Sequence, residues 1–158
     1  MHFRALKEAD LDALLDIYTH LHATDDSLPE REHVRALWDE VLRSPYFNYF
    51  GAFEGDQLIA SCTISIIPNF TRGCRPYGVI ENVVTHARFR KQGIGKGILL
   101  HALGFGWSLN CYKVMLMTGR KDEATFQFYE GAGFDRFAKQ AFVALSHSKV
   151  SLIDVCLL

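Results

Sequence analysis

Apolar residues in the first third of the chain recur with the spacing of amphipathic helices. After a strand-like segment at residues 2–6, they recur three or four positions apart over residues 11–21 and again over 34–42. Two helices are therefore predicted, each with one apolar stripe that covers another part of the fold. The stripe positions are Leu11, Leu14, Leu15, Tyr18 and Leu21 in the first helix, and Val34, Leu37, Trp38, Val41 and Leu42 in the second.

The period then changes from that of a helix to that of a strand. Residues 46–53 are rich in aromatic side chains, and residues 58–66 alternate between two sets of side chains. The intervening residues 54–57 have turn composition, so the two segments are expected to form an antiparallel hairpin. The β-branched run at residues 79–85 predicts a central strand.

The second half of the chain alternates helix and strand patterns. The predicted elements are a helix at 93–109, a strand at 113–118, a helix at 124–132 and a last strand at 137–145. A strand, a helix and another strand in succession favour a parallel pair beside the antiparallel hairpin. The fold class is therefore α+β, with a central mixed, largely antiparallel sheet flanked by helices. Glycines inside the helix at 93–109 are expected where it packs closely on that sheet.

Length and charge limit the classes of protein that remain. A chain of 158 residues is predicted to form one domain, here residues 1–145, followed by a tail at 146–158. The 17 basic and 18 acidic residues give a net charge of -1, which argues against a nucleic-acid binder. The longest apolar-leaning run, residues 58–67, is too short for a membrane span. The four cysteines show no zinc-binding spacing, so we expect no metal and a reduced, cytoplasmic protein.

Glycine and cationic residues gather in a loop between the strand at 79–85 and the helix at 93–109. The loop reads Arg-Lys-Gln-Gly-Ile-Gly over residues 90–95. Glycine lets an anion approach the backbone closely, and the first N–H groups of a helix lack partners and carry partial positive charge. We therefore expect a phosphate-binding loop. Its cations are Arg88, Arg90, Lys91 and Lys96.

The spacing excludes two common nucleotide-binding loops. A P-loop with its lysine at Lys96 would need serine or threonine where Gly97 stands. A dinucleotide-binding loop that begins at Gly93 would need its third glycine where Ile98 stands. What remains is the pattern R-x-x-G-x-G over residues 90–95.

This pattern resembles that of the GNAT superfamily of CoA-dependent N-acetyltransferases. The resemblance runs from about residue 47 to 145 and rests on two blocks. The first is Ile-Glu-Asn-Val-Val within residues 79–84, followed by the loop at 90–95. The second is Ala-Thr-Phe-Gln-Phe-Tyr-Glu-Gly-Ala-Gly-Phe at 124–134. The first block, with Asn-Cys-Tyr-Lys at 110–113, is most similar to glucosamine-6-phosphate N-acetyltransferases.

The resemblance implies a GNAT-like fold and acetyl-CoA as co-substrate. Loop amides would hold its pyrophosphate, and the central strand would pair with its pantetheine arm. The cofactor-binding residues implied are Val83, Val84, Arg90, Lys91, Gln92, Gly93, Ile94, Gly95, Lys96, Lys121 and Phe128. The family often has asparagine at the position of Lys121, which here can meet a CoA phosphate or point to water.

The chemistry needs a base for the amine and an acid for the thiolate. Glu81 matches the family glutamate that serves as base, and its alternative is a strand residue that faces solvent. Tyr129 matches the family tyrosine that protonates the thiolate, and its alternative is an aromatic packing residue. Arg72 and Arg75 lie in a loop that shapes the acceptor pocket in the family, or else in a solvated turn.

The function expected is transfer of an acetyl group to a primary amine of a small molecule, by direct attack in a ternary complex. Two alternatives remain: a non-catalytic acyl-CoA-binding module, or an acetyltransferase that acts on a protein or peptide amine. No nucleic-acid or membrane partner is expected. The apolar tail at 146–158 could add a strand or contact a second copy in a homodimer.

Overall fold

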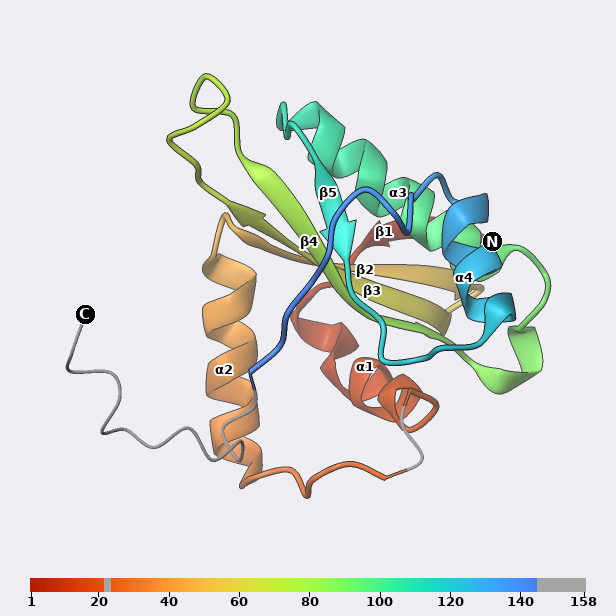
Figure 1. Cartoon of the computed structure of the whole chain (residues 1–158). Helices are drawn as coiled ribbons and strands as arrows, with labels where there is room; N and C mark the ends of the chain where they lie inside the picture. Colours follow the sequence, from red (N-terminus) through yellow and green to blue (C-terminus); the bar gives the residue numbers. More distant parts are fainter. Residues whose placement is uncertain (22–23, 145–158) are drawn as a thin grey trace, which may run out of the picture.

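One sheet of five strands separates two layers of helices (Figure 1). The computed structural model describes residues 1–21 and 24–144. Its elements in chain order are β1 (His2–Ala5), α1 (Leu11–Tyr18), α2 (Arg31–Arg43), β2 (Phe47–Glu54), β3 (Gln57–Ile67), β4 (Tyr77–Thr85), α3 (Ile94–Ser108), β5 (Val114–Leu116) and α4 (Glu123–Gly131), with one-turn 3₁₀ helices at Glu8–Asp10 and Ala87–Phe89.

The strands follow the order β1-β2-β3-β4-β5 across the sheet. The first three pairings are antiparallel, and only β4 and β5 run parallel, because α3 carries the chain back across the sheet between them. The predicted α+β class and the mixed, largely antiparallel sheet are therefore confirmed.

Helices α1 and α2 cover one face of the sheet, as their apolar stripes predicted. Leu14 and Ile17 of α1 and Trp38 of α2 are buried against Phe53. The stripe of α2 is only partly used, because Leu37 is 54% exposed and Leu42 is 37% exposed. Those two residues were expected in the core, so the helical period alone predicted too wide a buried face for α2.

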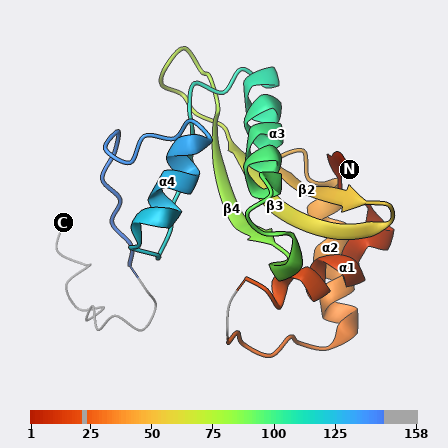
Figure 2. The ribbon, with the colours of Figure 1, turned by 90° about the vertical axis from the view of Figure 1, so that its right-hand side faces the viewer.

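Helix α3 covers the other face, and α4 stands on the opposite side of β4 from α1 and α2 (Figure 2). A Cβ atom on Gly97 would lie 2.6 Å from the Phe3 ring, and one on Gly106 would lie 2.9 Å from Val114. The expected close packing of α3 is confirmed at these two glycines but not at Gly104, which faces open space. None of the helices within residues 1–21 and 24–144 is both long and apolar enough to cross a bilayer.

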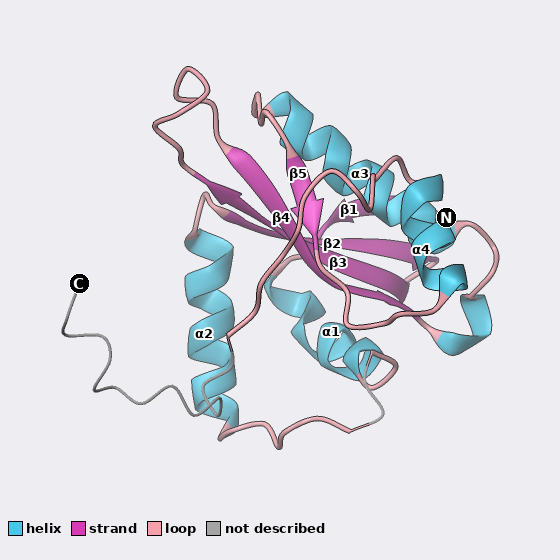
Figure 3. Ribbon diagram, viewed as in Figure 1, coloured by secondary structure: helices cyan, strands magenta, loops and turns pink. Residues whose placement is uncertain are grey.

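The predicted last strand at 137–145 is wrong over the residues described. Residues 137–144 form a loop without strand pairing (Figure 3). Phe137 is 86% exposed and Phe142 is 92% exposed, so the aromatic pattern that favoured a strand has no sheet face to pack on. The tail at 146–158 lies outside the described residues.

Candidate active site

A cavity opens where β4 and β5 separate. Their pairing runs from Gly78 opposite Val114 to Ile80 opposite Leu116, and it ends there. Beyond that point, residues 81–85 form one wall and the segment after β5 forms the other, around a cavity of about 890 Å³. The strand edge along 81–85 therefore faces the cavity in place of a neighbouring strand.

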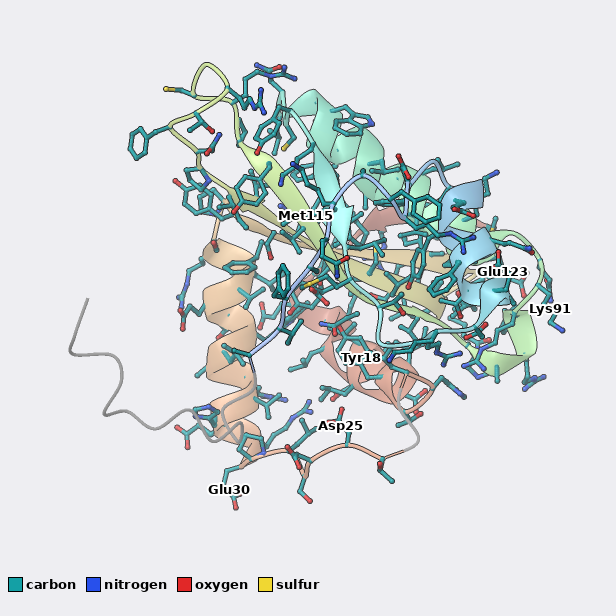
Figure 4. The ribbon with its side chains drawn as sticks, viewed as in Figure 1. Tyr18, Asp25, Glu30, Lys91, Met115 and Glu123 are labelled. Atoms are coloured by element: carbon teal, nitrogen blue, oxygen red, sulfur yellow. The ribbon has the colours of Figure 1, made fainter. Side chains whose placement is uncertain are left out.

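Most of the residues predicted for the site meet in this one cavity. The predicted residues that line it are Glu81, Val83, Val84, Arg90, Lys91, Gly93, Gly95, Lys96, Phe128 and Tyr129. Figure 4 shows Lys91 on the loop before α3, on the same side of the molecule as Glu123 of α4. Gln92, Ile94 and Lys121 do not line it. Ile94 is instead buried in the α3 core, and the Lys121 side chain is exposed.

A β-bulge in β4 sets the direction of the side chains on the cavity wall. Thr63 of β3 pairs with Glu81, but Ser61, two residues away, pairs with Val84, so β4 contains one extra residue. Asn82 has a φ of 52°, in the left-handed region. Before the bulge Ile80 packs on the α3 side, whereas after it Val83 packs on that side and Val84 on the α1 side. The bulge therefore changes the alternation of the strand inside the site.

The loop before α3 presents free backbone N–H groups to the cavity. Gly93 has a φ of 80°, and no side chain caps the helix that follows. The amide of Gly97 bonds to the Gly93 carbonyl at 2.9 Å, so the amides of residues 94–96 precede the first bond of the helix. A Cβ on Gly95 would lie 3.1 Å from both the Phe128 ring and Thr85 Oγ1, so glycine permits this close packing.

The Arg90 side chain connects the loop to the end of β4 and to the turn after α1. Its Nε donates to the Thr85 carbonyl at 3.0 Å, and its Nη2 donates to the His20 carbonyl at 2.9 Å. The His20 and His86 rings meet beside it with centroids 4.2 Å apart. Arg90 was predicted as a cofactor contact, and the structure gives its guanidinium a second role in positioning the loop.

Tyr129 is half-buried and lines the cavity together with charged groups of opposite sign. Burial raises the pKa of its phenol, the guanidinium of Arg120 lowers it, and the Glu81 carboxylate raises it. Thr118 approaches the phenol and lowers its pKa as well. The Tyr129 ring also packs on Phe128, with centroids 4.9 Å apart. The packing alternative and the predicted chemical position are therefore compatible for this residue.

The arginines predicted for the acceptor do not line the cavity. Arg75 donates from Nε to the Asn110 carbonyl at 3.2 Å and from Nη2 to the Cys111 carbonyl at 3.2 Å. These contacts satisfy backbone carbonyls just after α3, so they give Arg75 a structural role. Arg72 is exposed in the same loop with a φ of 58°.

The wall formed by the turn after β5 was missed in the sequence. The residues involved are Met117, Thr118, Gly119, Arg120, Asp122 and Thr125. Asp122 caps α4, because its carboxylate accepts from the amide and the hydroxyl of Thr125, both at 2.9 Å. The Asp-x-x-Thr spacing is a helix-start signal that could have placed this end of the cavity.

The cavity thus brings together a glycine loop, a separated strand pair, a carboxylate and a phenol, as an acyltransferase that uses an acyl-CoA would need. The chain belongs to the acetyltransferase (GNAT) family, whose family model matches residues 11–134. The predicted resemblance is thereby confirmed, and the protein is an N-acetyltransferase, an enzyme of the acyltransferase class.

Similar proteins agree with this membership. A glucosamine 6-phosphate N-acetyltransferase of Trypanosoma brucei brucei is 30% identical over 141 residues, which are 89% of this chain and 92% of the relative. A solved protein assigned as an acetyltransferase from Agrobacterium tumefaciens is 38% identical, with a TM-score of 0.84, covering 92% of this chain and all of that one (100%). One from Clostridium acetobutylicum, solved with acetyl-CoA, has the same fold at 19% identity, a TM-score of 0.71 and coverage of 90% and 95%.

Proposed function

We propose that the protein transfers the acetyl group of acetyl-CoA to a primary amine of a small molecule, by direct attack in a ternary complex. The observation that carries this proposal is that Glu81 and Tyr129 line the same cavity as the glycine loop. A base, an acid and an anion site on one cavity are what a single displacement between two bound substrates needs.

The lining of the cavity offers groups that suit the successive parts of acetyl-CoA. The amides of residues 94–96 and the cations Lys91 and Lys96 suit its pyrophosphate. The unpaired edge of β4 at residues 81–85 suits the amide groups of its pantetheine arm, which would extend the sheet as an added strand. This arrangement brings the thioester toward Tyr129.

Two residues of the chain carry the proton transfers that precede attack and follow C–S cleavage. Glu81 removes a proton from the acceptor ammonium, directly or through a water molecule, since a free alkylamine is protonated at neutral pH. The neutral nitrogen forms a bond to the thioester carbon, and a backbone amide near Val83 or Val84 donates to the resulting oxyanion. The C–S bond then breaks, Tyr129 gives its proton to the departing thiolate, and the nitrogen loses its remaining extra proton to solvent, which leaves a neutral amide.

The acceptor class we propose is a phosphorylated amino sugar. The support is the Trypanosoma brucei brucei relative, which is 30% identical and is named for glucosamine 6-phosphate. Because Arg72 and Arg75 do not line the cavity, the acceptor phosphate would be held by other cations along it.

Release of CoA thiol from acetyl-CoA tests the function, measured with glucosamine 6-phosphate, unphosphorylated amino sugars and peptide amines. We expect turnover with the first, and about a 100-fold or greater loss of kcat in Tyr129→Phe and in Glu81→Gln. Tyr46→Phe and Glu40→Gln are matched controls outside the cavity and should behave as wild type. Wild-type rates in both site variants would refute the assigned roles, and binding of acetyl-CoA without turnover on any amine would refute the transferase.

A further inference from the structure

The turn between β5 and α4 adds a further cation to the cavity lining, separate from those of the glycine loop. Arg120 lines the cavity together with Thr118 and Tyr129. The Arg120 amide donates to Thr118 Oγ1 at 3.2 Å, which fixes the turn. The Asp122 cap of α4 follows directly, so both ends of this short segment are held by hydrogen bonds.

Two charged groups, one positive and one negative, act on the phenol of Tyr129. Arg120 is the positive group whose charge acts most strongly on the phenol, and Glu81 is the negative one. A guanidinium stays protonated throughout the accessible pH range, so its charge does not vary during the reaction. A fixed positive charge next to a half-buried phenol favours the ionised form of that phenol.

We infer that Arg120 is a positioning residue that stabilises the phenolate formed when Tyr129 gives its proton to the CoA thiolate. The inference rests on the proposed function. The Tyr129 O–H bond breaks and an S–H bond forms, which leaves CoA thiol and a phenolate in the cavity that the guanidinium also lines. The phenolate recovers a proton from solvent before the next turnover. Neither oxidation nor reduction occurs, and Arg120 itself exchanges no proton.

Arg120→Gln tests this role, with Arg120→Lys as the conservative variant and Arg35→Gln on α2 as the matched control. In Arg120→Gln we expect kcat to fall about tenfold, with little change in the KM for acetyl-CoA. A tenfold fall corresponds to a rise of about one unit in the pKa of the Tyr129 phenol. The alkaline limb of the kcat profile should move to higher pH, because Tyr129 then holds its proton more strongly. Arg120→Lys should recover most of kcat, and Arg35→Gln should match wild type.

Two results would overturn the inference. One is a raised KM for acetyl-CoA at unchanged kcat, which would make Arg120 a phosphate contact. The other is an equal loss from Arg120→Gln in wild type and in Tyr129→Phe, since a residue that acts through the phenol adds nothing once the phenol is gone.

A measurement without turnover separates this inference from the proposed function. In the free protein with ¹³Cζ-labelled tyrosine, the Tyr129 resonance is identified by its loss in Tyr129→Phe. Arg120→Gln should raise the pKa of Tyr129, as followed by NMR titration, even if no amine is acetylated. An unchanged titration would refute the role of Arg120, whereas a shifted titration with no wild-type turnover would refute only the proposed function.

Discussion

At the scale of single residues, the site depends on backbone conformations that most side chains avoid. Asn82, Lys91 and Gly93 have φ values of 52°, 60° and 80°. Asparagine tolerates the left-handed region better than most residues, and β-branched residues tolerate it worst. Asn82 lies at the bulge of β4, and Lys91 and Gly93 lie in the loop before α3.

Asn82→Val should therefore be less stable than Asn82→Gly. Valine in the left-handed region costs about 1–2 kcal/mol, while glycine adopts it freely. Urea unfolding of both variants measures the difference, and acetyl transfer should fall further in the valine variant because the bulge is lost. Equal stability of the two variants would show that the left-handed conformation at this position is not required.

His86 should make the stability of the protein depend on mildly acidic pH. Its Nδ1 accepts from the Arg88 amide at 3.2 Å, which requires the neutral ring. Burial, His20, Arg88 and Arg90 lower the pKa of His86, and Asp16 opposes them. A lowered pKa means that its contribution is present above the ordinary value of about 6.5 and is lost as the pH falls below it.

Thermal unfolding at about pH 7.5 and about pH 5.5 checks this prediction. The drop in Tm on acidification should be smaller in His86→Gln than in wild type. His33→Gln, on the exposed side of α2, is the control and should keep the wild-type drop. The same drop in all three proteins would contradict the prediction.

At the scale of elements, α3 packs closely on the sheet at the positions where glycine faces it. Gly97 and Gly106 lie where the sheet and β1 come close, whereas Gly104 faces open space. The helix thus trades local propensity for close packing at Gly97 and Gly106, but not at Gly104. Replacing a glycine with alanine at each of two positions on this helix separates the effect of helix propensity from that of close packing.

Gly104→Ala should stabilise the protein by about 0.5–1 kcal/mol, since alanine is the better helix former. Gly97→Ala gains the same propensity, but its Cβ would lie 2.6 Å from the Phe3 ring, which stacks on His101. It should therefore be less stable than Gly104→Ala by about 1–3 kcal/mol. Chemical denaturation measures both, and equal effects would mean that Phe3 moves aside without cost.

The elements also show where sequence reasoning succeeds. The strands at 46–53, 58–66 and 79–85 were predicted because alternation and β-branching are local signals. The phosphate loop was predicted because its glycines have a fixed spacing. The turn at 117–122 was missed because its one local signal, the helix cap at Asp122, marks only where α4 begins. Its place in the site follows from the separation of β4 and β5 next to it. The strand at 137–145 failed because a strand needs a partner, which no local pattern supplies.

At the scale of the whole molecule, a chain with a net charge of -1 concentrates cations around one cavity. Lys91, Lys96 and Arg120 all line it, from two segments far apart in the sequence. A near-neutral protein can therefore present a strongly positive site to a single anionic ligand. Binding of that ligand should be visible in the stability of the entire domain.

Acetyl-CoA at about 100 times its Kd should stabilise the fold by about 2.7 kcal/mol. For a domain of this size the Tm should rise by roughly 5–10 °C. Pantetheine, which lacks the pyrophosphate, is the matched ligand and should give a clearly smaller shift at the same concentration. Equal shifts with both ligands would show that the glycine loop is not the anion site.

The bulge at Asn82 has a consequence for how β4 tolerates change in length. A regular strand has a parity, in which odd and even residues serve opposite layers, and one extra residue reverses that parity halfway along. Loss of residue 82 alone would remove the extra residue and leave a regular strand in which Val83 and Val84 keep the layers that they serve relative to Ile80. The bulge therefore lets β4 hold one residue more than a regular strand between Glu81 and Val84, without a change in the layer that Val83 or Val84 serves.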